Sequence, residues 1–158
     1  AYTVLAALHR KLNEPKPERE VLARLAARCA DAVDAYLRLM ELATEARDWP
    51  AVAQNGERFL AVNPLLPEPH RLLARAQEEL GQPQRAVASC RTLLKLDPAD
   101  PADVHFRLAR LLHQQGDPAA KRHAIQALEE APRFRDAHRL LLEINRAKKS
   151  ETSANTLP

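Results

Sequence analysis

The side chains with the greatest capacity for chemistry in this sequence are arginines spaced three or four residues apart. Arg71 and Arg75 form one such pair and Arg107 and Arg110 another, so each pair shares one face if its segment is helical. A guanidinium group donates forked hydrogen bonds that suit carboxylate or phosphate partners. The same spacing also lets each arginine pair with glutamate on its own or an adjacent helix, and both interpretations stay open.

Signatures of catalysis are missing from the sequence. It contains no HExxH, GxSxG, GxxxxGK or CxxC motif. His70, His105 and His138 recur at similar places along the chain, which indicates features of a repeat and not a metal cluster. We therefore predict no enzyme activity, no cofactor and no metal site. Cys29 and Cys90 lie too far apart in the expected fold to bridge, and we expect two buried free thiols.

The composition favours a helical protein. Apolar residues make up 46% of the 158 residues and aromatic residues 4%, so the expected core is closely packed leucine and alanine. The 12 prolines fall mostly at expected helix ends, which argues against a β-sandwich. The net charge of +3 is mildly basic, and no block of five or six basic residues exists.

Targeting signals are not visible either. There is no run of 18 apolar residues and no signal peptide, so we expect no membrane segment and leave the compartment open. Because the chain begins at Ala1 without Met, we interpret it as a processed chain or a segment of a longer protein.

The elements that position the arginines are predicted by a fixed period. Pro64, Pro98 and Pro132 are evenly spaced, since 98 − 64 = 34 and 132 − 98 = 34. Each interval contains two helical apolar patterns separated by a glycine, Gly81 or Gly116. A period of this length with a turn midway is typical of a helix–turn–helix array. We expect helices near residues 2–12, 17–30, 32–46, 49–62, 67–80, 83–96, 101–115, 118–131 and 135–149.

The unit between the prolines resembles the tetratricopeptide repeat. The positions that correspond to its pattern are His70, Leu73, Ala74, Gln77, Ala86, Cys90, Leu93 and Pro98. The resemblance implies an all-α fold, a right-handed α-solenoid of antiparallel helix pairs. We predict a single array over residues 1–149, with repeats at about 1–32, 33–66, 67–100 and 101–134 and a capping helix at 135–149. Residues 150–158 are predicted to be a disordered tail.

The resemblance also implies a binding surface, because the first helix of each repeat lines the concave side of such an array. Four acidic residues at the first turn of these helices also fall near this surface and are expected to complement the helix dipoles: Asp34, Glu68, Asp103 and Asp136. The predicted function is a non-catalytic scaffold that binds a protein or peptide partner on the concave face. Its candidate residues are Arg38, Glu41, Arg71, Arg75, Glu78, Phe106, Arg107, Arg110 and Arg139.

Three other functions were weighed against this one. A chaperone-binding carboxylate clamp is rejected, because Leu37, Glu41 and Leu72 stand where the resemblance requires lysine and asparagine. RNA binding is disfavoured, because glutamates share the face and stacking aromatic residues are few. The main alternative is a C-terminal repeat segment of a larger, possibly enzymatic, peptidase-type protein that serves assembly or substrate positioning. The identity of the partner and the oligomeric state stay open.

Overall fold

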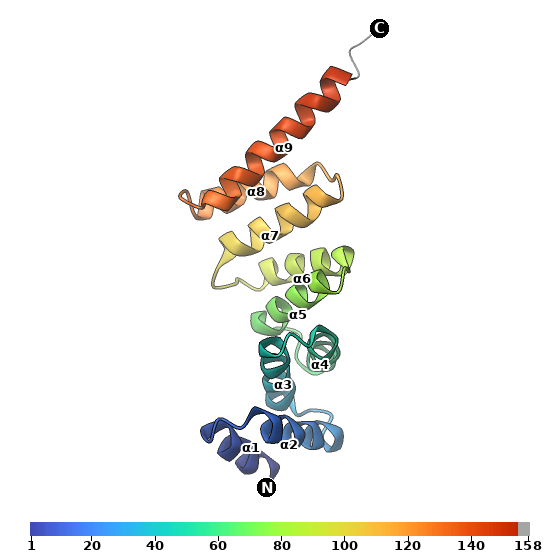
Figure 1. The fold of residues 1–158 in the computed structure, drawn as a ribbon, viewed down its shortest axis with the longest axis vertical. Coiled ribbons are helices and arrows are strands. Elements are labelled where there is room, and N and C mark those ends of the chain that lie inside the picture. The colour runs from blue at the N-terminus through green and yellow to red at the C-terminus, as the bar shows by residue number, and fades with distance from the viewer. Residues whose placement is uncertain (155–158) are drawn as a thin grey trace. The chain divides into compact units, whose positions relative to one another are not determined.

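The computed structural model describes residues 1–154, with side chains described for residues 1–147. In this part of the chain every regular element is a helix, and the helices follow one another in the predicted order (Figure 1). Their bounds are α1 (Tyr2–Lys11), α2 (Pro15–Arg28), α3 (Val33–Glu45), α4 (Trp49–Val62), α5 (Pro67–Glu79), α6 (Pro83–Lys95), α7 (Pro101–Gln114), α8 (Ala119–Glu130) and α9 (Arg135–Ala154). Helix α9 passes the expected end at residue 149, which corrects that boundary. The rest of the predicted tail, 155–158, lies outside the described residues.

The chain divides into two compact units, one at Ala1–Ser89 and one that begins at Cys90. In the first unit each helix from α1 to α5 packs on the next, and α3 also contacts α5. In the second unit α7 contacts both α8 and α9, and α8 contacts α9. Each unit therefore builds its core from helices that are neighbours in sequence, as helical repeats do.

The turn inside each helix pair has the same backbone conformation. Its left-handed residue is Asn13, Arg47, Gly81 or Gly116, with φ angles of 56°, 55°, 67° and 70°. The spacing follows the predicted period, since 47 − 13 = 34, 81 − 47 = 34 and 116 − 81 = 35. In each turn the next residue donates its N–H to a carbonyl five residues back, as Glu14 does to His9 at 2.9 Å. This hydrogen bond is typical of the Schellman motif, which ends a helix and reverses the chain.

The core consists mostly of aliphatic side chains, as the composition predicted, with a few aromatic rings among them. In the first unit Met40, Val52 and Phe59 are almost fully buried, and Leu73 is buried beside them. The cluster of the second unit contains Ala109, Ala124 and Leu140, with Phe106, Leu141 and Ile144 packed against it. Leu108 is fully buried, whereas Leu141 is only half-buried.

Gly56 explains how closely α4 approaches its neighbours. It is buried in the middle of α4, where glycine costs about 1 kcal/mol relative to alanine. A Cβ atom there would lie 2.9 Å from Cε of Met40 and 3.4 Å from Cδ1 of Leu73. The glycine therefore makes room for two large side chains from α3 and α5.

The two cysteines have different environments. Both are free; Cys90 is buried and Cys29 is exposed. The prediction of two buried thiols is therefore wrong for Cys29. Cys29 is the C-cap of α2, so it lies just beyond the end of the helix, where fewer neighbours cover it.

Candidate partner-binding surfaces

Arg38 on α3 has the most enclosed side chain among the predicted site arginines. Its Nε and Nη2 donate to Oε1 and Oε2 of Glu18 at 2.6 and 3.0 Å, and its Nη1 donates to Glu41 at 2.9 Å. Glu18, on α2, is only 2% exposed. The hydrogen bonds with Glu18 are the main reason that the pKa of Arg38 is raised above its ordinary value. Arg38 and Glu41 thus belong to a charge cluster that joins α2 to α3.

The predicted residues on α5 face solvent and have different partners. Arg71 is exposed and donates from Nε and Nη2 to the carboxylate of Glu68, at 2.8 and 2.5 Å. The guanidinium carbon of Arg75 lies 5.3 Å from the ring centroid of Trp49, a cation–π contact. Trp49 is half-buried and packs against the core of the first unit. Glu78 is half-buried on the same helix.

In the second unit the structure gathers three predicted residues around one pocket. Phe106 and Arg110 on α7 and Arg139 on α9 line a pocket of about 200 Å³, together with Asp136, Leu140 and Glu143. The ring of Phe106 is fixed by Phe134, at a centroid distance of 4.8 Å. The pocket combines an apolar floor with charges of both signs, which is a common composition for a binding site.

Two arginines of the second unit have carboxylate neighbours on their own helices. Arg107, which does not line the pocket, lies 3.6 Å from Asp103, and Arg139 lies 3.4 Å from Asp136. Both carboxylates are in the first turns of their helices, where sequence reasoning assigned them a dipole role only. The structure therefore supports the pairing interpretation of these arginines, as it does for Arg38 and Arg71.

Sequence reasoning missed several residues of these surfaces. Glu18 was predicted only as part of a helix, and Leu140 was not proposed for the binding surface. The contact between Arg75 and Trp49 was also not predicted. A three- or four-residue offset could have identified the contacts within α5, α7 and α9. No comparable spacing rule predicts contacts between side chains of different helices.

The three related histidines play two different roles. Nε2 of His70 and of His138 each lie 2.9 Å from a proline carbonyl oxygen six residues earlier, that of Pro64 or Pro132. His105 departs from the predicted common role. Its Nδ1 lies 3.1 Å from Nδ1 of His123, and the two rings stack at 5.3 Å. Burial lowers the pKa of both, to about 4 for His123.

Comparison with known proteins gives the family. A sequence model of the tetratricopeptide repeat matches residues 50–101 and again residues 71–120. Residues 50–120 therefore consist of tetratricopeptide repeats, as the sequence resemblance implied. No curated protein matches its sequence.

Solved tetratricopeptide repeat structures show the same fold at low sequence identity. The structure of MamA has a TM-score of 0.82 at 14% identity and covers 92% of this chain and 85% of its own. YrrB, described as a tetratricopeptide repeat protein with an unusual peptide-binding site, has a TM-score of 0.82 at 17% identity, with 94% and 76% covered. An O-GlcNAc transferase mutant of Thermobaculum terrenum has a TM-score of 0.60 at 21% identity, with 81% and 25% covered. The fold is an all-α helical repeat solenoid.

Two kinds of feature are absent from the described residues. No helix is both long and apolar enough to cross a membrane. No three of the His, Cys, Asp and Glu side chains there are grouped so that they could hold a metal ion.

Proposed function

We propose that this tetratricopeptide repeat protein is a non-catalytic scaffold that binds a protein or peptide through the first helices of its pairs. Each unit offers a surface of its own, formed by α3 and α5 in the first unit and by α7 and α9 in the second. The partner-binding residues include Arg75, Glu78, Phe106, Arg110 and Arg139. Arg38, Glu41, Arg71 and Arg107 belong to the same first helices and, like Arg139, have charged partners within the protein.

The pocket around Phe106, Arg110 and Arg139 is the observation that carries this proposal. It joins side chains from two first helices, and it offers an aromatic ring and exposed arginines to the same ligand. Aromatic residues and arginine are the types that most often dominate the binding energy of protein interfaces. Peptide binding by YrrB, a protein of the same fold, supports a partner of the same class.

The second candidate function is a repeat segment that positions a substrate or assembles a larger enzyme. The match to the O-GlcNAc transferase favours this second function, because the match covers only 25% of the transferase chain. A fold of this kind therefore occurs inside a longer enzyme chain. In that case the same first-helix surface would hold a substrate protein instead of a separate partner.

Affinity capture with charge-reversed variants tests the proposal. The first variant carries Arg75→Glu, Arg110→Glu and Arg139→Glu on α5, α7 and α9. The matched control carries Arg24→Glu, Arg58→Glu and Arg91→Glu, which are exposed on the second helices α2, α4 and α6. Both change the net charge equally. Partners that the wild type captures should be lost with the first variant and kept with the control, and the reverse pattern would exclude this surface.

A further inference from the structure

Helix α1 carries an exposed apolar face. Val4, Leu5 and Leu8 are 74%, 42% and 50% exposed, and Leu12, the C-cap of the helix, is 58% exposed. We call these four residues the α1 stripe. Within the part of the chain whose side chains are described, no other helix exposes more than one large hydrophobic side chain. Aliphatic side chains gathered in this way on one exposed face mark a surface that another molecule covers.

The equivalent face is covered in the two following helix pairs. The residues one and two periods after Leu5 and Leu8 are all buried: Leu39, Leu42, Leu73 and Ala76. Each of their helices packs on the helix before it, since α2 contacts α3 and α4 contacts α5. Among the described residues α1 packs on α2 alone, so no preceding helix covers its face. The outer face of a terminal repeat is normally polar, and an apolar one indicates a missing partner.

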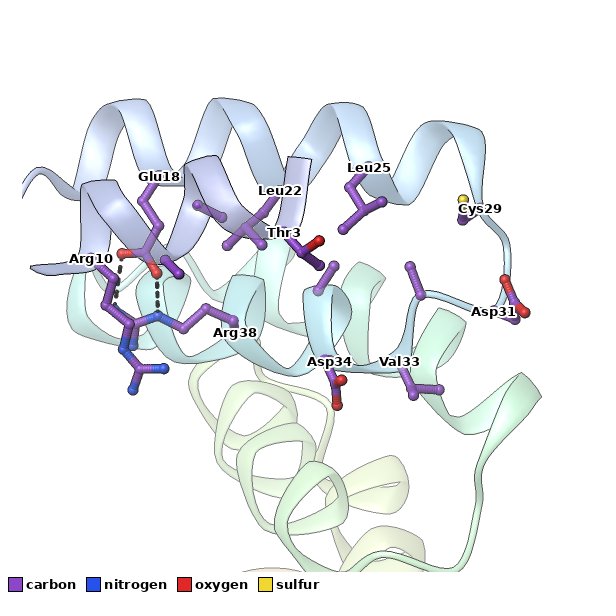
Figure 2. A pocket seen from close by; sticks show the side chains of 14 residues that line it. Thr3, Arg10, Glu18, Leu22, Leu25, Cys29, Asp31, Val33, Asp34 and Arg38 are labelled. Carbon is purple, nitrogen blue, oxygen red and sulfur yellow. Dashed lines mark hydrogen bonds and ion pairs between the residues drawn. The ribbon is translucent and has the colours of Figure 1, made fainter. Parts of the chain in front are cut away.

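The α1 stripe lies on the side of α1 that faces away from α3. On the opposite side, Thr3, Ala7 and Arg10 line a cavity of about 410 Å³ among α1, α2 and α3 (Figure 2). An α-helix turns by about 100° per residue, so Leu8 and Arg10 lie about 200° apart around the helix axis. A partner on the stripe therefore uses neither this cavity nor the surfaces of the proposed function, and the inference goes beyond that function.

We propose that a second copy of this chain covers the α1 stripe, with the two α1 helices packed antiparallel. Val4, Leu8 and Leu12 are spaced four residues apart and form one row along α1. The row is symmetric about Leu8, so a two-fold axis beside Leu8 places Val4 against Leu12 of the partner subunit. No other described helix exposes an apolar row that could match it. Lys11 lies beside the row near its end, so the two lysines of the dimer do not meet.

Sedimentation equilibrium measures this dimer. The contact is small, so the dimer is expected to be weak, and protein concentrations up to about 1 mM are needed to populate it. Leu8→Lys removes the central side chain from both copies at once and should raise the dissociation constant about a hundredfold, tenfold for each copy. The matched control is Leu65→Lys, the same change at a leucine that is 72% exposed between α4 and α5, and it should leave the dissociation constant unchanged. Circular dichroism melting verifies that both variants are folded.

Two further experiments test the antiparallel arrangement. Val4→Glu should weaken the dimer, and adding Leu12→Lys should restore it, because the two-fold axis then forms the new ion pair twice. In a Cys29→Ser background, which removes the exposed native thiol, Leu8→Cys should give a disulfide-linked dimer on oxidation with copper–phenanthroline. Leu65→Cys in the same background should not.

Three outcomes would overturn the proposal. The first is a wild-type chain that stays monomeric at the highest concentration, even if its α1 stripe bound phospholipid vesicles or a helix of another protein instead. The second is a dimer that Leu8→Lys leaves intact, because the contact would then lie elsewhere. The third is a Val4→Glu variant that Leu12→Lys does not rescue, because the two helices would then not be antiparallel.

Discussion

Nε of Arg38 lies 2.6 Å from Oε1 of Glu18, a carboxylate that is only 2% exposed, and this pair ties α3 to α2. A buried carboxylate pays a large desolvation cost, which its guanidinium partner offsets through two charge-assisted hydrogen bonds. Arg38 therefore stabilises the first unit whether or not a partner is bound. The consequence is that a change in binding on mutating Arg38 must be separated from a change in folding.

The substitution Arg38→Met should lower the free energy of unfolding by about 3 kcal/mol, because it leaves the Glu18 carboxylate buried without its partner. Arg71→Met is the matched control, since Arg71 pairs with Glu68 at an exposed site and its loss should cost less than about 1 kcal/mol. Urea unfolding followed by circular dichroism measures both. Equal losses for the two variants would show that Glu18 is not desolvated as the structure indicates.

The turn of the second helix pair should be improved by glycine. Arg47 has a φ of 55°, in the left-handed region that costs a non-glycine residue about 1 kcal/mol. Arg47→Gly should therefore raise the free energy of unfolding by several tenths of a kcal/mol, after the larger chain entropy of glycine is subtracted. Gly81→Ala, at the equivalent turn with a φ of 67°, should have the opposite sign. Thermal melting measures the two variants, and a destabilised Arg47→Gly would contradict the shared turn geometry.

Most of the fold could be predicted from the sequence, because the helices and turns depend on residues that are close together in the chain. The positions of the turns at Asn13, Arg47 and Gly81 follow from the period, and each helix ends within two or three residues of its expected position apart from α9. Contacts such as Glu18–Arg38 and Trp49–Arg75 could not be predicted, because they join different helices and depend on side-chain rotamers. The cavity beside Thr3 and Ala7 depends on the volumes of side chains from three helices, which no spacing rule provides.

The second unit should lose stability as the pH falls from about 6.5 to about 4. Burial lowers the pKa of His123 to about 4 and also lowers that of His105. For His123 the neighbouring charges of His105, Arg122 and Arg91 act in the same direction, while Glu129 and Glu130 oppose the shift of His105. The unfolded chain therefore binds protons first as the pH drops, and the free energy of unfolding decreases with it.

Urea unfolding at a series of pH values checks this dependence. His123→Gln should flatten it, because the variant removes the group with the lower folded pKa. His113→Gln, on α7 but outside the stacked pair, should keep it. A wild-type protein that is as stable at pH 4 as at pH 6.5 would argue against the buried neutral pair.

Trp49 should report on Arg75, since it is the only tryptophan in the sequence. Arg75→Gln removes the cation 5.3 Å from its ring and should change the fluorescence emission, at a cost of about 0.5 to 1 kcal/mol in stability. Arg58→Gln, an exposed change on α4, is the control and should leave the emission as it is. Emission that does not respond to Arg75→Gln would mean that the guanidinium does not lie over the ring in solution.

Hydrogen–deuterium exchange of the protein with its captured partner is the most direct measurement of where that partner lies. The account predicts slower amide exchange in α5, α7 and α9 on addition of the partner, with α4 and α8 little changed. Protection confined to α4 and α8 would contradict it, because the partner would then lie on the second helices.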